Sequence, residues 1–125
     1  MTKEAALHAF YSSFGLKAYE ENAVPTGDDA PDFPYLTYSV SSDSIGIDVA
    51  LTASLWYRGT SWVQANAKAE EISRRIGRGG KILSCDGGAI WLRRGTPFAQ
   101  SMGDESDDQI KRKYINITAE FLTAD

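Results

Sequence analysis

The chain has 125 residues, of which 42% are hydrophobic and 24% are charged, and this composition excludes a disordered tail and a fibrous repeat. Its 13 basic and 17 acidic side chains give a net charge of −4 at pH 7, which disfavours direct binding to nucleic acid. Its apolar runs are too short to cross a membrane and its first residues lack the apolar core of a signal peptide. We therefore expect a soluble, intracellular protein without membrane contact.

The charges are unevenly divided along the chain. Residues 1–67 carry 3 basic and 8 acidic side chains, whereas residues 68–125 carry 10 basic and 9 acidic ones. Exposed charges of this kind are mostly solvated. The alternative is that an acidic face and a mildly basic face bring copies of the chain together head to tail.

The first helix is predicted over residues 2–14, with Thr2 as its N-cap and Gly15 at its end. Its apolar side chains recur at helical spacing and form one stripe: Leu7, Phe10, Tyr11 and Phe14. His8 lies beside this stripe. A surface or packing role is expected for it, because neither a nucleophile nor an orienting partner is close in sequence.

Residues 15–34 are predicted to be a long loop, because three prolines and five carboxylates disfavour both helix and sheet. Loops of this length are uncommon inside a compact domain and are usually functional or ordered against a partner. An arm that lies on a neighbouring subunit would be one such use.

Two half-buried strands are predicted over residues 35–40 and 47–58, where apolar and polar side chains alternate. The short polar link between them favours an antiparallel hairpin. Trp56 falls on the otherwise polar side of the second strand. It either packs against a helix or anchors an interface, and the pattern does not separate these interpretations.

The clearest helix is predicted over residues 61–76. Ser61–Gln64 fits a capping box, Gly77 can close the helix, and the basic side chains Arg74, Arg75 and Arg78 suit its C-terminal end. The apolar residues recur every three or four positions: Trp62, Ala65, Ala69, Ile72 and Ile76.

A second hairpin is predicted from strands at 81–85 and 89–94, and a long final strand at 110–122. Cys85, beside the hairpin turn, is expected to be a small packed side chain and not a nucleophile.

Residues 95–109 are predicted to be a second long loop. Its four carboxylates form either a solvated turn or a site for a hard cation, although the spacing of a calcium hand is absent: Asp104, Glu105, Asp107 and Asp108.

The predicted order is helix, strand, strand, helix, strand, strand, strand. It predicts an α+β fold, with residues 1–125 forming a single domain in which two helices pack on a mostly antiparallel sheet of two hairpins and a long C-terminal strand. The single histidine, the single cysteine and the lack of a phosphate-binding motif argue against an enzyme, and we expect no metal and no cofactor.

Several blocks rich in Trp, Gly and Pro stand in a fixed order: Ala50–Trp62, Gly79–Lys81, Asp86–Gly88 with Trp91, Arg94–Gln100 and Ser106–Lys113. Together they resemble the small minor capsid or tail terminator proteins of long-tailed bacteriophages and prophages of Gram-positive bacteria. The resemblance spans roughly residues 4–122.

This resemblance implies a structural virion protein without catalysis, which assembles in the bacterial cytoplasm and lies at the head-proximal end of the tail. It would cap the growing tail tube as a ring, expected to be a hexamer, end its polymerisation and offer the surface to which the head joins. The implied partners are other copies of the chain, the tail tube protein and a head completion or connector protein. DNA would pass through the lumen without specific binding.

Chemistry, and not the resemblance, selects the candidate contact residues. Loops often carry function, and aromatic and arginine side chains dominate interfaces, so we expect contacts at Trp56, Arg58 and Phe98. The four carboxylates Asp104, Glu105, Asp107 and Asp108 are expected to line an acidic lumen along which DNA slides.

Two alternatives stay open. A head-closure or adaptor protein on the portal side would have the same size and the same kind of oligomeric assembly as a tail terminator. A small hydrolase or ligand-binding module would need a pocket with convergent titratable groups.

Overall fold

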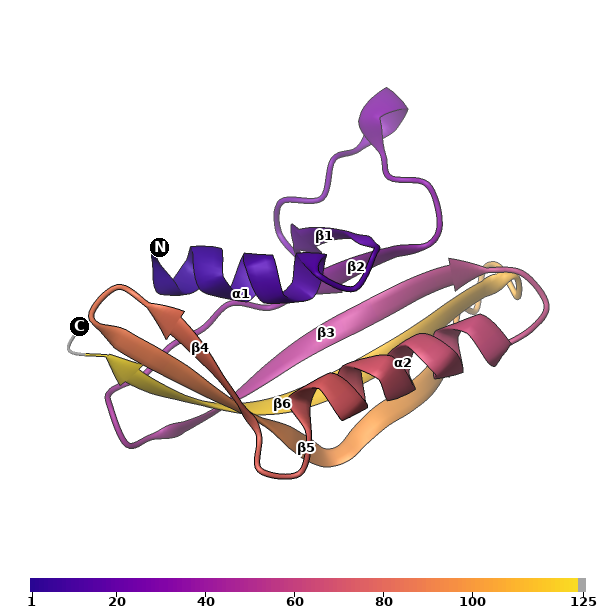
Figure 1. Cartoon of the computed structure of the whole chain (residues 1–125). Helices are drawn as coiled ribbons and strands as arrows, with labels where there is room; N and C mark the ends of the chain where they lie inside the picture. Colours follow the sequence, from indigo (N-terminus) through magenta and orange to yellow (C-terminus); the bar gives the residue numbers. More distant parts are fainter. Residues whose placement is uncertain (124–125) are drawn as a thin grey trace.

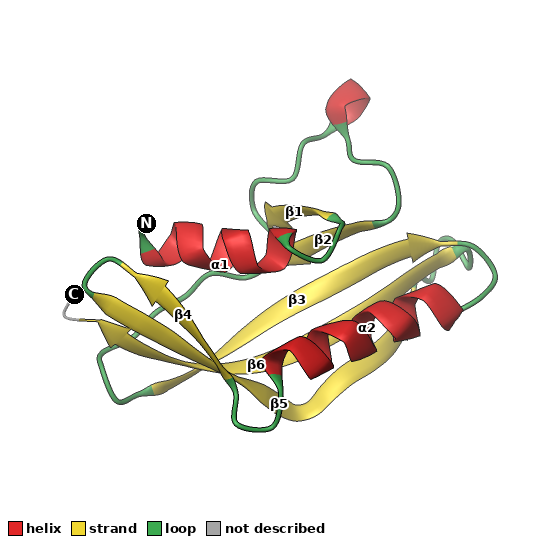
Figure 2. Ribbon diagram, viewed as in Figure 1, coloured by secondary structure: helices red, strands yellow, loops and turns green. Residues whose placement is uncertain are grey.

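The computed structural model describes residues 1–123. Its elements, in chain order, are α1 (Lys3–Ser12), β1 (Lys17–Glu20), the 3-10 helix η1 (Gly27–Asp29), β2 (Tyr35–Tyr38), β3 (Asp48–Arg58), α2 (Val63–Ile76), β4 (Lys81–Cys85), β5 (Gly88–Gly103) and β6 (Ile110–Thr123). Six strands form one sheet in the order β1-β2-β3-β6-β5-β4 (Figure 2). Strands β1 and β2 are parallel, and the other neighbouring pairs are antiparallel. The predicted α+β fold with its mostly antiparallel sheet is confirmed, and the predicted elements occur in the predicted order, with β1 as an additional strand.

The prediction that residues 15–34 are wholly a loop is wrong for the segment Lys17–Glu20. This segment forms β1, whose residues pair in parallel with β2 from Lys17–Tyr35 to Glu20–Tyr38. A four-residue strand carries little periodic signal of its own. β2 supplies its backbone hydrogen-bond partners, and residues 21–34 separate the two strands in the sequence.

The predicted loop at 95–109 is also shorter than expected, because β5 continues to Gly103. The pairing of β5 with β6 shifts register between Arg94 and Ala99, and this bulge accommodates Gly95 and Pro97, residues that usually interrupt strands. The amide of Asn116 on β6 donates to the carbonyl of Pro97 at 2.9 Å and holds the bulge in place. The loop proper covers residues 104–109.

The predicted N-terminal cap is found in α1 but not in α2, and α1 ends at Ser12 with Ser13 as its C-cap, two residues before the predicted end. Thr2 caps α1 as expected, since its hydroxyl accepts a hydrogen bond from the amide of Ala5 at 3.0 Å. The capping box expected for α2 is wrong. The helix begins at Val63, and the Ser61 hydroxyl accepts only from the Val63 amide, at 3.1 Å.

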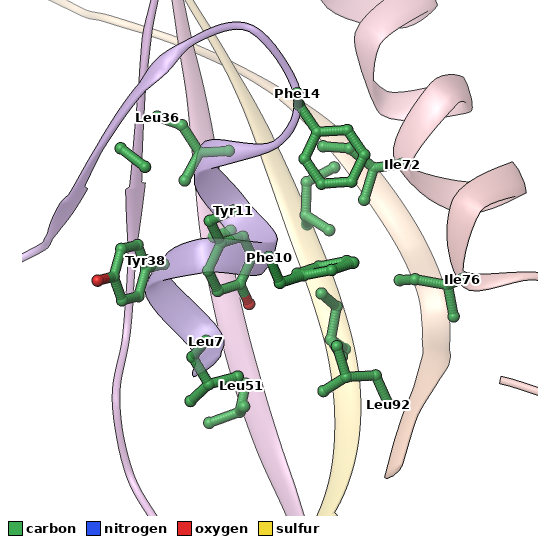
Figure 3. Close-up of a cluster of buried hydrophobic side chains, with 14 of the residues drawn as sticks. Leu7, Phe10, Tyr11, Phe14, Leu36, Tyr38, Leu51, Ile72, Ile76 and Leu92 are labelled. Atoms are coloured by element: carbon green, nitrogen blue, oxygen red, sulfur yellow. The ribbon is translucent and has the colours of Figure 1, made fainter. Parts of the chain in front are cut away.

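The hydrophobic core lies on one face of the sheet, between the strands and both helices (Figure 3). The stripe of α1 and the Ile72 and Ile76 side chains of α2 meet the apolar odd-numbered residues of β3 and β6 there. Leu7, Tyr11 and Ile115 among them are fully buried. α1 contacts both edge strands, β1 and β4, so that the sheet curls around it (Figure 1). The N-terminal ammonium group of Met1 adds an ion pair with Asp86 of the β4–β5 turn at 2.7 Å.

Within residues 1–123, none of the helices has the length and apolar character that a membrane span requires.

Candidate interaction surface

The face of the sheet opposite the helices is the candidate functional site. Side chains alternate along a strand, so the even-numbered residues of β3 and their partners on β2 and β6 point away from the core. We call the central part of this surface the open face; it consists of Tyr35, Thr37, Thr52, Ser54, Trp56, Arg112, Tyr114, Asn116 and Thr118. Most of these side chains are half-buried by their neighbours in the sheet.

An aromatic and arginine stack lies across three strands of the open face. Trp56 on β3 stacks on Tyr35 of β2, with ring centroids 6.1 Å apart and planes at 15°. The guanidinium of Arg112 on β6 lies 5.0 Å from the Trp56 ring centroid and 5.1 Å from that of Tyr114. Partial burial raises the pKa of Tyr35. We call these four residues the Trp56 stack.

Hydrogen bonds fix the orientation of the two central groups of this stack. The Trp56 indole N–H donates to the Thr37 hydroxyl at 2.9 Å, and Nε of Arg112 donates to the Ser54 hydroxyl at 2.9 Å. The stack is therefore preorganised before any partner arrives, which lowers the entropy cost of binding. Because Trp56 faces away from α1 and α2, it packs within the sheet surface and not against a helix; its role as an interface anchor stays a prediction.

A second cation–π pair lies further along the same side of the sheet. The Arg93 guanidinium sits 4.2 Å from the Trp91 ring centroid and also pairs with Asp48 of β3. The Trp91 indole donates to the Gly79 carbonyl at 3.0 Å. Sequence reasoning did not select Trp91, Arg93, Arg112 or the two tyrosines, although their alternation with core residues places them on the polar side of their strands.

Two of the carboxylates expected to line a lumen have partners in their own loop, and one of them also pairs with a side chain of β3. Asp104 accepts from the Ser106 amide and hydroxyl at 2.8 and 2.6 Å, and the hydroxyl bond contributes most to lowering the pKa of Asp104. Asp107 accepts from the Gln109 amide at 2.9 Å and pairs with Arg58 at 2.6 Å, and both contacts lower its pKa.

The other two carboxylates of this loop accept no hydrogen bond comparable to those of Asp104 and Asp107 in the described part of the chain. Glu105 and Asp108 point to solvent with exposed side chains, and the Lys111 ammonium donates to the backbone carbonyl of Asp108. Within residues 1–123, no three His, Cys, Asp or Glu side chains gather closely enough to hold a metal ion. The structure thus brings Arg58 and Asp107 together, while the lumen-lining role of the loop stays a prediction.

Phe98 lies apart from the open face. It is half-buried against the core beside α2, where it lines a shallow groove of about 350 Å³ with Asn66, Ala69, Glu70, Ser73, Ala99 and Lys113. Its predicted role as a contact residue is not tested by this placement.

His8 and Cys85 take the structural positions expected for them. The two ring nitrogens of His8 lie 2.9 Å from the Tyr38 hydroxyl and 3.3 Å from the Ser12 hydroxyl. Cys85 is a free thiol that packs, half-buried, against the core. The two side chains lie in separate parts of the fold and do not form a nucleophile and base pair.

Comparison with solved structures shows a likeness in fold. One chain of a structure described as the virion of a native gene transfer agent particle superposes with a TM-score of 0.55 and 21% sequence identity, covering 94% of this chain and 89% of that chain. No protein-family profile matches the sequence, and no curated protein matches it. These findings define a class of fold: a two-layer α+β domain similar to a chain of the gene transfer agent virion.

Proposed function

We propose that this chain is a structural virion protein that forms a ring at the head-proximal end of a phage-type tail, ends tube polymerisation and offers the surface for head joining. The observation that carries the proposal is the likeness in fold, over 94% of the chain, to a chain of the gene transfer agent virion. The order of the Trp, Gly and Pro blocks supports the tail terminator role within that class.

The size of the domain supports a ring. A compact chain of 125 residues has a radius of gyration of about 14 Å, so one copy is too small to surround a DNA duplex. A closed ring uses head-to-tail contacts, in which two different surfaces of each copy meet. Six copies are the number that the family resemblance implies.

The open face supplies a surface for a partner in the virion. Tryptophan, tyrosine and arginine are the residues most enriched at the energetic centres of interfaces, and the Trp56 stack holds all three in fixed orientations. We assign this face to the tail tube protein. The helix-covered face is occupied by the core of the chain itself.

Passage of DNA through such a ring requires weak interaction with phosphate. The net charge of −4 disfavours adhesion of DNA to the protein surface, and the exposed carboxylates Glu105 and Asp108 would repel it further if they line the lumen. If the loop has this role, neutralising both side chains will slow DNA ejection or reduce infectivity. Unchanged infectivity would remove the loop from the lumen.

The ring and the tube contact are tested together by measuring the native mass of the protein over a range of concentrations, with and without tail tube protein, followed by electron microscopy. We expect closed rings, or tubes capped at one end. Trp56→Ala should abolish capping, whereas Trp56→Phe should retain most of it. Asp43→Ala, at an exposed carboxylate outside this face, should behave as wild type. A protein that stays monomeric and leaves tubes uncapped would overturn the tail terminator role, and binding to a portal protein instead would establish the adaptor alternative.

A further inference from the structure

The segment between β1 and β2 forms an arm that projects from the sheet. We call residues 21–34 the arm; η1 forms its tip (Figure 1). At its base the Glu21 amide donates to the Tyr38 carbonyl at 2.8 Å. Beyond the base, its backbone hydrogen bonds are local, such as that from the Ala30 amide to the Gly27 carbonyl at 3.2 Å, and residues 26–30 are exposed.

The arm is uniformly acidic. It carries Glu21, Asp28, Asp29 and Asp32, and neither lysine nor arginine occurs between Lys17 and Arg58. Within residues 1–123, these four carboxylates take part in no side-chain hydrogen bond or ion pair. An exposed acidic segment whose carboxylates pair with no group of its own described domain is suited to ordering against a partner.

A complementary cluster lies around the turn between α2 and β4. We call Arg78, Lys81 and Arg94 the basic turn. Arg94 donates to the Gly77 carbonyl at 3.2 Å and to the Ser73 hydroxyl at 3.2 Å, which holds its guanidinium beside the turn. In the described part of the chain no carboxylate pairs with any of the three, in contrast to Arg74 and Arg75, which face Glu70 and Glu71 one helical turn away.

The arm and the basic turn lie on opposite sides of the molecule, with the arm at the top and the α2–β4 turn at the bottom of the view in Figure 1. They therefore cannot meet within one copy. Opposite charges on two different, distant surfaces define a head-to-tail contact, which closes into a ring or continues as a filament.

We propose that the arm of one copy docks on the basic turn of a second copy of this chain, with Asp28, Asp29 and Asp32 facing Arg78, Lys81 and Arg94. This inference rests on the proposed ring and names its contact. All of these charged residues except the half-buried Lys81 are exposed before docking. The contact therefore speeds association and weakens as salt rises, because ions screen exposed charges within about 10 Å at 0.1 M.

Charge reversal tests the contact directly. D28K/D29K on the arm, or R78E/K81E on the basic turn, should each raise the protein concentration at half assembly about tenfold, and combining the four changes should bring it back close to wild type. D43K is the matched control, since Asp43 is an exposed carboxylate on another loop. Melting curves should stay close to that of wild type, because Asp28, Asp29, Asp43 and Arg78 are exposed and Lys81 is half-buried on the edge strand β4.

Disulfide trapping tests the same contact by geometry. In a C85S background, the double variant D29C/R78C should give a covalent ladder that ends at the ring number under oxidation, whereas a mixture of the two single variants should stop at a dimer. D43C/R78C is the control and should stay monomeric on a denaturing gel.

The outcomes separate this inference from the proposed function. A wild-type protein that assembles, with a half-assembly concentration unaffected by either reversal and no ladder from D29C/R78C, would overturn the arm contact and leave the ring intact. A wild-type protein that never assembles, alone or on tubes, would overturn both.

Discussion

The two faces of the sheet use the same strands in different ways. On the helix-covered face, residues such as Leu51, Leu55 and Ile115 are fully buried and apolar, so their contribution comes from removing area from water. On the open face, the neighbouring positions hold Trp56, Arg112 and Tyr114, whose contacts are stacking, cation–π and hydrogen bonds. The first face contains the core of the domain, and the second face is the one we propose for assembly. Substitutions on the two faces should therefore separate stability from binding.

The largest effect is expected on the covered face. Leu51→Ala removes a fully buried side chain and leaves a cavity, and should lower the free energy of unfolding by about 3 kcal/mol. Urea unfolding followed by circular dichroism measures this. The matched open-face substitution is Thr118→Ala, which should change the same quantity by less than about 0.5 kcal/mol. Equal losses at the two sites would contradict the division between the faces.

A smaller effect on stability is expected for the Trp56 stack. Trp56→Ala removes the ring that contacts Tyr35 and Arg112 and should cost about 1 kcal/mol of unfolding free energy, although it should abolish tube capping. Thermal melts and capping assays on the same preparation give both values. A loss as large as that of Leu51→Ala would mean that Trp56 belongs to the structural core.

A gain in stability is expected at one buried position. The Tyr11 hydroxyl is buried and has no hydrogen-bond partner within residues 1–123, while its ring stacks on Tyr38 at 4.7 Å. Burial also raises the pKa of Tyr11 far above the usual range, so the group stays neutral. Tyr11→Phe keeps the ring and should raise the free energy of unfolding by about 1 kcal/mol. A clear loss of stability in urea would show that the hydroxyl is satisfied.

The smallest effect is expected from the loop that joins β5 and β6, outside both faces. The pKa values of Asp104 and Asp107 are lowered from 3.8 in the folded chain, so their stabilising contribution is complete above that value and is lost as the pH falls through the lower folded pKa values. Asp107→Asn should therefore make the loss of stability below about pH 4 shallower. Unfolding at several acidic pH values measures this slope, and Asp43→Asn should leave it unchanged.

The sequence alone determined the elements whose signals are local. The alternation in β3 and β6 and the stripe in α2 each follow from which side chains avoid water. Apolar residues spaced 2 or 3.6 positions apart predict a strand or a helix from the local sequence alone. The same alternation put Trp56 on the polar side of its strand. It did not show that Tyr35, Arg112 and Tyr114 surround it, because strand neighbours come from pairing between distant segments.

Only the tertiary structure decided the features that depend on such pairing. β1 exists because β2 supplies its hydrogen bonds. β5 continues past Gly95 and Pro97 because these residues lie in the bulge opposite Asn116, where the regular pairing with β6 is interrupted. The separation of the arm from the basic turn likewise follows from the position of α2 on the curled sheet. Backbone pairing and long-range packing satisfy groups that local sequence leaves unsatisfied, and for this reason they override local propensity where the two disagree.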